Sequence, residues 1–441
     1  MPHVIYVAIG FPPAAKSCAY RMREVANELC AHGWDVTVVS LDREAWEQEY
    51  GLDESLLARV DRRVRIVELP LRRADLAPEV SRYSWLRARH PDAWVKVRRT
   101  ADQLRFPEPV YGSWRPALEK AVSAIHDEHP ADLVLVSPAP NTAMAAAWRL
   151  HSSHGVPYVV DFRDSWSLDL LEDRPRFPAD SRAGRWERRI VGSAAGLWFV
   201  NEPIRNWYAA TYPTVADRMR VVRNGFEPDD VQVPPLPRER GDGPMTFGYL
   251  GTMHLTHDHV RAMIQGWRFA RRAYTPLQNA RFEIRGHIGM GSSRAATGSA
   301  AQIAEARVHQ IHYLGPVRRS EVSAVYAGLD ALVLALAGGR YVTSGKVYEY
   351  MATGRPIVSV HQPDHDAARL LQGYPLWVPA ASLSQRDITE AFVRTAKLAE
   401  SVTPEQMQEA QAYARRFERR LMIAPAVSDL AAIVGRERVG A

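Results

Sequence analysis

The chain has 441 residues, of which 46% are hydrophobic and 24% charged, so it has room for about two or three domains and the composition of a soluble globular protein. Its most apolar stretch, 329–337, is too short to cross a membrane, and two cysteines exclude a disulfide framework or a cysteine-rich zinc cluster. The net charge of +6 permits anionic partners, namely nucleic acid, a membrane surface or a phosphorylated small molecule.

The first residues enter a predicted strand at once, with no basic region, long apolar segment or cleavage site before it, so we expect no secretion signal. The scarcity of cysteine fits a reducing, cytoplasmic location. Between residues 59 and 118, arginines are interspersed with Trp85, Trp94 and Trp114. Such a segment suits a lipid headgroup surface, single-stranded nucleic acid, or solvated helices packed by a few aromatic residues, and the sequence leaves the three open.

Residues 1–227 are predicted to form one α/β domain. The opening HVIYV is a strand, residues 17–32 carry apolar positions at helical spacing, Gly33 ends that helix, and DVTVVS returns to the sheet. Further strands are expected within 132–137, 157–162, 195–200 and 219–223. This alternation predicts a parallel sheet, interrupted at about 59–118 by a basic, aromatic insert that we expect to be helical.

Residues 228–245 are rich in proline, glycine and charge, which is typical of a linker. The strand–helix alternation restarts over 246–404, and residues 405–441 are expected to form helices that return to the N-terminal domain. The predicted fold class is therefore α/β, with two doubly wound, Rossmann-like domains facing each other across a cleft. Ligands of such sheets bind beyond the carboxyl ends of the strands.

A short predicted helix that starts at Ser344 carries the most specific signal. Ser344 can cap its first amides, Gly345 permits close approach of another molecule, and Lys346 adds a positive charge where the helix dipole is already positive. This favours binding of an anion such as a diphosphate. Glu349 lies on the same side of the helix, where its carboxylate can accept hydrogen bonds from a sugar diol. A weak surface pair between Lys346 and Glu349 is the alternative.

Polar residues also follow a strand of the N-terminal half. Asp161, Arg163 and Asp164 come at its carboxyl end, where they can orient sugar hydroxyls or phosphate oxygens. An internal aspartate–arginine bridge that fixes the loop fits the same spacing, which does not distinguish the two.

In the C-terminal half, Gly251 ends a strand and is followed by Thr252 and His254, an arrangement that lets backbone amides reach a phosphate. Two later strand ends are suitable walls for a nucleotide base and ribose: Arg285, Gly286, Gly315 and Val317. The alternating histidines at 254, 257 and 259 have no matching cysteines or acidic cluster, so we predict no metal site. Neither a G-x-S-x-G elbow nor a complete phosphate loop occurs, which argues against a serine hydrolase and a P-loop triphosphatase.

Together these segments resemble glycosyltransferase family 4, a retaining family with the GT-B fold, over nearly the full length. SGKVYEYMATGRPIV is similar to the donor-site helix of the family, and SPAPNTAMAAAWRLHSSHGVPYVVDFRDSW to the N-domain segment of a subgroup with a DFRD-type loop. VVRNGFEPDD resembles the Asn-Gly segment before the linker, and FGYLGTM the first strand and turn of the donor domain.

The resemblance implies transfer of a sugar from a nucleoside diphosphate donor to a hydroxyl-type acceptor with retention of configuration, in glycan, glycolipid or natural-product biosynthesis. The leaving diphosphate would take the acceptor's proton, with no metal and no cofactor. Lys346 would contact the diphosphate, and Glu349 would bind the nucleotide ribose. Asp161, Arg163 and Asp164 would lie near the reaction centre, so these three and Lys346 are the predicted catalytic residues.

The resemblance also implies the remaining site residues. The predicted donor-binding set is Gly251, Thr252, His254, Arg285, Gly286, Gly315, Val317, Thr343, Ser344, Gly345, Lys346 and Glu349. The loop FPPAAKS would face the acceptor through Pro13, Ala14, Ala15 and Lys16. The chain departs from the family at Tyr341, where a glutamate is usual, and at Thr252, where an arginine often stands. The identity of the donor sugar is therefore not carried over.

Three other functions remain open at this point. A sugar-nucleotide epimerase or hydrolase with the GT-B fold would need no acceptor. A degenerate homologue would bind a sugar nucleotide without turnover, as the departures at Tyr341 and Thr252 allow. Nucleic-acid binding rests on charge alone and is not expected. For a transferase, the acceptor is a small molecule, a glycan or a lipid-linked molecule, and peripheral contact with the inner face of the membrane is left open.

Overall fold

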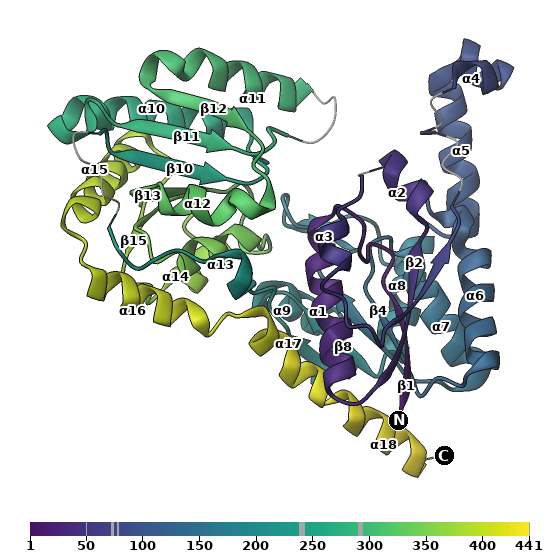
Figure 1. Cartoon of the computed structure of the whole chain (residues 1–441). Helices are drawn as coiled ribbons and strands as arrows, with labels where there is room; N and C mark the ends of the chain where they lie inside the picture. Colours follow the sequence, from purple (N-terminus) through teal and green to yellow (C-terminus); the bar gives the residue numbers. More distant parts are fainter. Residues whose placement is uncertain (50, 72–74, 77–78, 238–242, 290–293, 441) are drawn as a thin grey trace. The chain divides into compact units, whose positions relative to one another are not determined.

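The computed structural model describes residues 1–441 except 50, 72–74, 77–78, 238–242, 290–293 and 441 (Figure 1). The chain divides into two compact units. The first unit comprises Met1–Asp169, Arg174–Asn224 and Met422–Ala441, and the second comprises Leu170–Asp173 and Gly225–Leu421. Each unit is built on its own parallel sheet, so the prediction of an α/β fold with two Rossmann-like domains is confirmed.

In its described residues, the first unit contains a seven-stranded parallel sheet in the order β3-β2-β1-β4-β5-β8-β9. The strands are β1 (His3–Val7), β2 (Asp35–Leu41), β3 (Arg65–Leu69), β4 (Leu133–Val136), β5 (Tyr158–Phe162), β8 (Gly196–Phe199) and β9 (Met219–Val221). Every residue of β1, β4, β5 and β8 is buried. Such strands must be apolar on both faces, because helices cover both sides of a parallel sheet.

Helices follow most of these strands. They are α1 (Ser17–Ala31), α2 (Arg43–Glu49), α3 (Glu54–Leu57), α4 (Trp85–Arg89), α5 (Pro91–Arg105), α6 (Arg115–Glu128), α7 (Thr142–His154), α8 (Arg182–Ser193) and α9 (Glu202–Thr211). A short antiparallel pair, β6 (Leu168–Asp169) and β7 (Arg174–Pro175), follows β5. Gly33 has a φ of 79° just after α1, the left-handed conformation in which a helix commonly ends.

The end of the chain contributes to the same core. Helices α17 (Arg419–Ser428) and α18 (Leu430–Gly440) run through the segment that returns to the first unit. Ile423, Val427 and Leu430 are fully buried in one cluster with residues of β1 and β2. The first unit is therefore completed by residues distant in sequence from its sheet.

The insert at about 59–118 is not helical throughout. Arg65–Leu69 forms β3, which pairs in parallel with β2 at the edge of the sheet. None of its residues is fully buried, and charged Arg65 and Glu68 stand among its apolar positions. The expectation of a helical insert was wrong here because an exposed edge strand lacks the continuous apolar run that marks a central one.

The second unit contains, in its described residues, a six-stranded parallel sheet in the order β12-β11-β10-β13-β14-β15. The strands are β10 (Thr246–Leu250), β11 (Arg281–Arg285), β12 (Ile311–Gly315), β13 (Ala331–Ala335), β14 (Ile357–Val360) and β15 (Trp377–Pro379). The chain builds the sheet outwards from β10, first to β11 and β12 on one side and then to β13, β14 and β15 on the other. The strand order therefore reverses at β10. Ligands of such sheets bind at the carboxyl ends beside a reversal of this kind.

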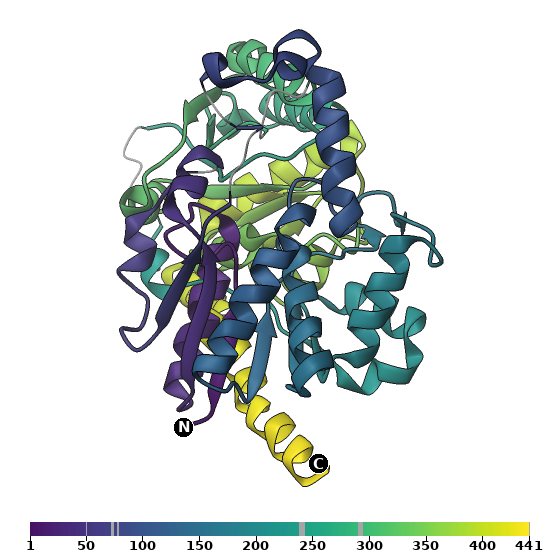
Figure 2. The same cartoon turned by 90° about the vertical axis from the view of Figure 1, so that its right-hand side faces the viewer.

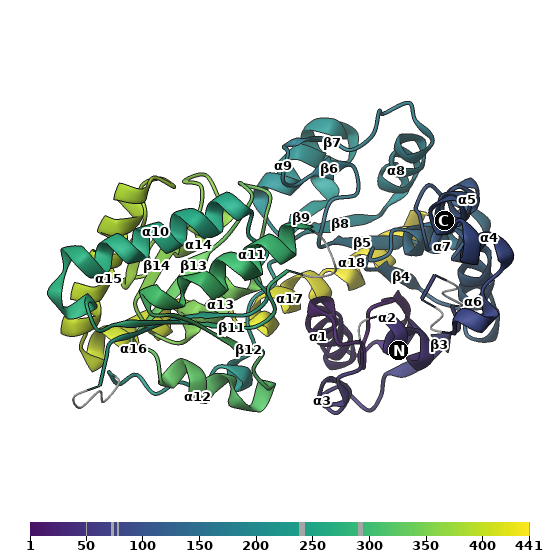
Figure 3. The ribbon, with the colours of Figure 1, turned by 90° about the horizontal axis from the view of Figure 1, so that it is seen from above.

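The helices of the second unit are α10 (His257–Ala273), α11 (Arg294–Glu305), α12 (Val322–Ala327), α13 (Gly345–Ala352), α14 (Asp366–Leu371), α15 (Gln385–Ser401) and α16 (Pro404–Arg415). Helices α10 and α15 pack against each other (Figure 3). Among the described residues of either unit, no helix is both long and apolar enough to cross a bilayer.

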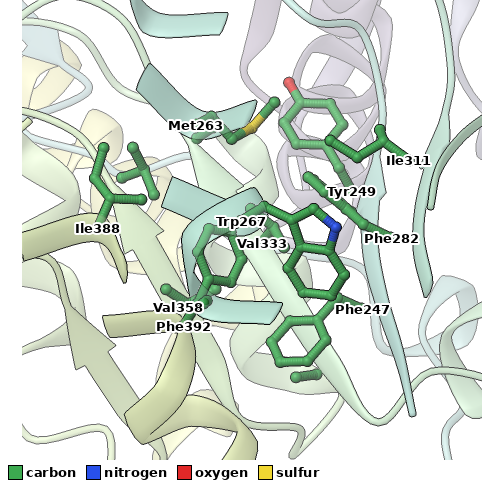
Figure 4. Packing of buried hydrophobic residues seen from close by; sticks show 14 of the residues in the cluster. Phe247, Tyr249, Met263, Trp267, Phe282, Ile311, Val333, Val358, Ile388 and Phe392 are labelled. Carbon is green, nitrogen blue, oxygen red and sulfur yellow. The ribbon is translucent and has the colours of Figure 1, made fainter. Parts of the chain in front are cut away.

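The core of the second unit is centred on aromatic side chains. Phe247, Trp267, Phe282 and Phe392 lie within one buried cluster, with the Trp267 ring centroid 5.2 Å from that of Phe247 and 5.3 Å from that of Phe392 (Figure 4). The Trp267 indole N–H donates a hydrogen bond to the His309 carbonyl at 2.9 Å. The core thus satisfies the one polar atom of its largest side chain.

Replacement of Trp267 by alanine should destabilise the second unit by about 3–5 kcal/mol, because the large buried ring leaves a cavity that its neighbours fill only in part. Trp85→Ala is the matched control, since Trp85 is 70% exposed and its loss should change stability little. Chemical denaturation followed by circular dichroism measures both. Equal losses for the two variants would contradict the packing described here.

Candidate functional site

The turn after β10 is tightly packed. Gly251 has a φ of 108°, and a Cβ placed on it would lie 2.7 Å from Cε of Lys346. Its amide donates a hydrogen bond to the Arg285 carbonyl at 2.8 Å. Position 251 therefore requires glycine both for its backbone conformation and for the close approach of the lysine.

The neighbouring strand ends are joined in the same way. Gly286, after β11, has a φ of 129°, and a Cβ there would lie 2.3 Å from the Gly251 carbonyl oxygen. The Gly286 amide donates to the carbonyl of Gly315, at the end of β12, at 2.8 Å. Val317 follows Gly315 by two residues and is partly buried. The carboxyl ends of β10, β11 and β12 thus come together. That they form walls for a base and a ribose stays a prediction.

Lys346 reaches back from α13 to this turn. Its Nζ donates a hydrogen bond to the Thr252 carbonyl at 2.8 Å and lies 5.4 Å from the centre of the Tyr249 ring. Burial lowers the pKa of Lys346 to about 8, although the nearby Glu349 carboxylate acts to raise it. A partly buried ammonium group with a single backbone acceptor gains strongly from an added anion. Lys346 is therefore not the exposed member of a surface pair.

Glu349 is held by a buried tyrosine. The Tyr326 hydroxyl donates a hydrogen bond to Oε2 of Glu349 at 3.2 Å, which leaves Oε1 as the oxygen available to a ligand. Tyr350, also buried, accepts from the Leu250 amide at 2.7 Å and donates to the Leu250 carbonyl at 3.1 Å. These two hydroxyls fix the side of α13 that carries Glu349 against the sheet.

The start of α13 is open. The Ser344 side chain makes no capping hydrogen bond, contrary to the expectation from sequence, and the first turn contains no acidic residue. Gly345 is exposed, and an added Cβ would meet nothing within 4 Å. The Thr343 hydroxyl donates to Oδ2 of buried Asp366 at 3.0 Å, which fixes the chain before the helix. Amides at an uncapped helix start, next to Lys346, are suited to an anion.

Two of the predicted donor residues differ in their surroundings from Lys346. Arg285 donates from Nε to the Glu283 carboxylate at 3.0 Å, so its charge is already paired. Loss of hydration and the Lys346 charge lower the pKa of exposed His254, which favours its neutral form. Lys346 is therefore the better candidate for the cation of this site.

Tyr341, at the position that departs from the family pattern, is buried. Its neighbour Arg340 forms an ion pair with Asp173 at 2.6 Å, and the Arg340 guanidinium lies 5.0 Å from the Tyr341 ring centre. Gly338 has a φ of 88°, and a Cβ there would lie 2.5 Å from a methyl group of Val342. The loop between β13 and α13 is thus compact.

In the first unit, the Asp161 carboxylate is occupied. Both of its oxygens accept from Arg21, at 2.8 Å from Nε and 2.6 Å from Nη2, and the two side chains are 0% and 2% exposed. Arg21 Nη1 also donates to the Arg223 carbonyl at 3.1 Å. This buried bidentate pair ties α1 to the end of β5 and to the segment after β9. The partner is Arg21 of α1, which the sequence did not single out, rather than Arg163.

Arg163 and Asp164 are differently placed. Arg163 is partly buried and Asp164 exposed, and within the described part of the chain neither side chain forms a hydrogen bond or an ion pair. The electrostatic neighbours of Arg163 include Cys18 at the start of α1 and both aspartates of the loop. Arg163 is thus a cation beside a carboxyl end of the sheet that can bind an anionic or hydroxylated ligand.

The loop before α1 follows β1, so it lies at the carboxyl edge of this sheet. Ala14 forms a bridge with Leu52, and the Ala15 amide donates to the Gly51 carbonyl at 3.1 Å. Pro13 and Ala14 are buried and Ala15 is exposed. Lys16 places its Nζ 5.1 Å from the centre of the Trp46 ring. Of the four residues predicted to face an acceptor, Pro13 and Ala14 therefore anchor the loop. Ala15 and Lys16 are at least partly exposed to solvent.

Glu108 was also missed by the sequence reasoning. Its carboxylate accepts at 2.9 and 2.7 Å from the amides of Asn141 and Thr142, and at 3.1 and 2.6 Å from their side chains. It thereby caps the start of α7 after β4. Burial nevertheless raises the pKa of Glu108. No local sequence pattern marks this cap, because Glu108 is 33 residues from Asn141 and 34 from Thr142.

No group of three or more histidine, cysteine, aspartate or glutamate residues in the described part of the chain is arranged to hold a metal ion. His259, one of the three alternating histidines, instead has its Nδ1 2.6 Å from the Thr256 hydroxyl. The Thr256 hydroxyl also accepts from the His259 amide and so caps α10. The spacing of these histidines therefore reflects a helix start.

Two protein-family models match the chain. Residues 18–225 match a glycosyl transferase 4-like domain, and residues 244–395 match the glycosyl transferases group 1. The two matches fall on the first and the second unit. A search of curated proteins gives no match.

Solved structures with the same fold include three that cover nearly the whole chain. A glycosyltransferase from Rickettsia africae is 11% identical, with a TM-score of 0.67 and coverage of 98% of both chains. HepE from Anabaena, in complex with UDP and glucose, is 12% identical, with a TM-score of 0.62 over 97% of this chain and 99% of that one. A putative UDP-N-acetylglucosamine 2-epimerase from Listeria monocytogenes is 10% identical, with a TM-score of 0.53 over 100% and 97%. At these identities the likeness concerns the fold.

Arg21→Met should destabilise the protein by about 3–5 kcal/mol, because it leaves the buried Asp161 carboxylate without its partner. Arg43→Met is the control, since Arg43 pairs with Glu54 where both side chains are largely exposed, and its loss should change little. Thermal and chemical unfolding measure the difference. A stability of Arg21→Met close to that of the control would show that the pair does not anchor the end of β5.

Proposed function

Since this chain belongs to the GT-B glycosyltransferases, with a glycosyl transferase 4-like domain followed by a glycosyl transferases group 1 domain, we propose that it transfers a sugar from a nucleoside diphosphate to a hydroxyl-type acceptor with retention of configuration. The observation that carries the proposal is the ammonium group of Lys346, held at the uncapped start of α13 beside the Gly251 turn. Biosynthesis of a glycan, a glycolipid or a natural product is the expected setting.

The second unit is proposed to bind the donor. Lys346 and the amides at the start of α13 would stabilise the diphosphate, whose negative charge increases as the bond to the sugar breaks. Glu349, kept in place by Tyr326, would accept hydrogen bonds from the ribose hydroxyls. HepE, which shares the fold, has been crystallised with UDP and with UDP-glucose, which supports a nucleotide-sugar donor without fixing the base here.

Retention would follow from attack on the face that the leaving group vacates. The bond between the anomeric carbon and the diphosphate oxygen breaks, the acceptor oxygen bonds to the same face of that carbon, and its proton passes to the departing diphosphate. This scheme needs neither a protein base nor a metal ion. The protein would contribute positive charge and a fixed geometry for the leaving group.

The first unit is proposed to bind the acceptor. Arg163 and Asp164 are the polar groups offered for contact with it, together with the loop from Pro13 to Lys16. Asp161 would act by positioning, since its two oxygens hold Arg21 and so fix the strand end from which Arg163 extends. A cytoplasmic location with peripheral contact at the membrane is part of the proposal.

A sugar-nucleotide epimerase or hydrolase is the second candidate, supported by the shared fold of the Listeria putative epimerase. Product analysis separates the candidates. Transfer yields a new glycoside with the donor's anomeric configuration, whereas the second candidate converts or hydrolyses the donor without an acceptor. Binding of a sugar nucleotide with no product in the presence of acceptors would indicate the degenerate homologue.

Titration calorimetry with a panel of nucleoside diphosphates and their sugars should reveal selective binding of one nucleotide. Lys346→Ala should weaken it about 10- to 100-fold, the loss expected for one hydrogen bond to a charged group. Glu349→Gln should weaken nucleoside binding but not binding of inorganic pyrophosphate. Lys397→Ala, an exposed lysine of the same unit, is the control and should bind normally. Absence of binding to the whole panel would overturn the donor-site assignment.

The same affinity should depend on pH. Because burial lowers the pKa of Lys346 to about 8, the free protein loses this positive charge as the pH rises through 8. Nucleoside diphosphate affinity is then expected to fall by up to about tenfold per pH unit above that value. Lys346→Met should abolish this part of the dependence. An affinity that stays constant from pH 7 to 9.5 would rule out Lys346 as the diphosphate cation.

A further inference from the structure

Helices α4 and α5 expose apolar side chains to an unusual degree. Val97 is 59% exposed, Leu104 68% and Trp85 70%. Figure 1 shows α4 and the beginning of α5 extending beyond the neighbouring strands and helices of the first unit, and Figure 2 shows the same helices in blue from the side. Large exposed apolar residues that occur together on one element indicate an interaction surface.

The two sides of α5 have opposite roles. Asp102 is the only buried residue among its fifteen, and its carboxylate accepts from the Val110 amide at 3.2 Å. Val97 and Leu104 are seven residues apart, two helical turns, and so project from one face, with exposed Ala93 and Ala101 beside them. That face points away from the side fixed by Asp102. It is an apolar stripe that no described part of the chain covers.

Cations border this stripe. At 100° per residue, Lys96 lies on one side of it and Arg98 and Arg105 on the other. The charged residues of α4 and α5 are Arg87, Arg89, Lys96, Arg98, Arg99 and Arg105 against Asp92 and Asp102. An apolar stripe with cations on both sides is the pattern of a helix that lies in a membrane interface.

Aromatic residues extend the surface to α4. The Arg87 guanidinium lies 3.6 Å from the Tyr83 ring centre and 4.8 Å from that of Trp94, which fixes α4 against α5. Trp85 remains exposed at the start of α4, with its ring edge towards His90. Tryptophan and tyrosine are favoured at the level of lipid headgroups because their rings are apolar and carry a polar atom.

The carboxyl end of α5 is firmly attached to the unit. Phe106 is fully buried, and its ring centroid lies 5.3 Å from those of both Trp166 and Trp186. Arg182, at the start of α8, donates to the Gln103 carbonyl at 2.8 Å and also to the Leu104 carbonyl. The exposed stripe is therefore presented by an anchored helix, in a fixed orientation relative to its own sheet.

We propose that α4 and α5 form a docking surface for a membrane rich in anionic phospholipid, with Val97, Leu104 and Trp85 entering the interface and the flanking cations contacting headgroup phosphates. Charge complementarity favours this occupant. Single-stranded nucleic acid is less well matched, because it stacks its bases on a row of exposed rings, and Trp85 is the only exposed ring of α4 and α5, beside the aliphatic Val97 and Leu104. A single short helix gives modest, salt-sensitive, reversible attachment. The surface deepens the proposed membrane contact but does not depend on the donor site.

Co-sedimentation of the full chain with vesicles tests the surface. Binding is expected to vesicles of phosphatidylglycerol mixed with phosphatidylcholine, to be weak for phosphatidylcholine alone, and to decrease as salt is raised. The double variant Val97→Ser/Leu104→Ser should reduce the partition coefficient about tenfold or more, because two apolar side chains no longer enter the interface. Lys96→Gln/Arg98→Gln should reduce it by a similar factor on anionic vesicles only.

Val308→Ser is the matched control, because Val308 is 78% exposed in the second unit and outside the surface. Nucleotide titration of every variant, or its melting temperature if no nucleotide binds, checks the fold separately, so failure of the docking surface and failure of the proposed transferase are distinguishable. Unchanged vesicle binding by Val97→Ser/Leu104→Ser would overturn the proposal. So would absent binding to anionic vesicles, including the outcome in which single-stranded DNA binds the wild type instead.

Discussion

The proposed donor site depends on one close approach, that of the Lys346 side chain to the backbone at Gly251. Only a glycine leaves room for Cε of the lysine, and only a fixed helix start brings Nζ to the Thr252 carbonyl. The Tyr350 hydroxyl supplies that fixation, since it closes two hydrogen bonds with the backbone at the end of β10. The packing that orders the ammonium group also buries it, and burial disfavours its charged form. A bound anion would stabilise that charged form.

The two units treat charge in different ways. Two buried carboxylates of the first unit are satisfied internally, Asp161 by Arg21 and Glu108 by the amides at the start of α7. These carboxylates are not free to bind a ligand, but their hydrogen bonds tie the carboxyl ends of β4 and β5 to neighbouring segments. The second unit instead leaves a helix start uncapped and a cation with one neutral acceptor. Such an arrangement is less stable than a capped helix with a paired cation would be, and it is common at functional sites.

Much of the fold could be predicted from the sequence because buried parallel strands such as β1 and β13 are continuous apolar runs. The segment from Ser344 to Glu349 marked the candidate anion site because it places a lysine at a helix start. The strand β3 was missed since an edge strand has no such run. Arg21 and Asp161 are 140 residues apart, so no local pattern could pair them, although an arginine among the apolar positions of α1 was a sign of a buried partner. The absence of a Ser344 cap likewise depends on side-chain geometry that propensity does not determine.

The attachment of Glu108 has a consequence for how this molecule could vary or be redesigned. The segment between α5 and α6 is a structural part of the first unit, because it supplies the cap of α7 and the buried ring of Phe106. The outer portion, from α4 through the first turns of α5, has no comparable role in the core. A relative or an engineered chain could therefore exchange that outer portion, which carries Trp85 and Val97, for another sequence. The segment from Asp102 to Trp114, which carries Leu104, would have to be retained. The insert is thus modular only beyond its anchor.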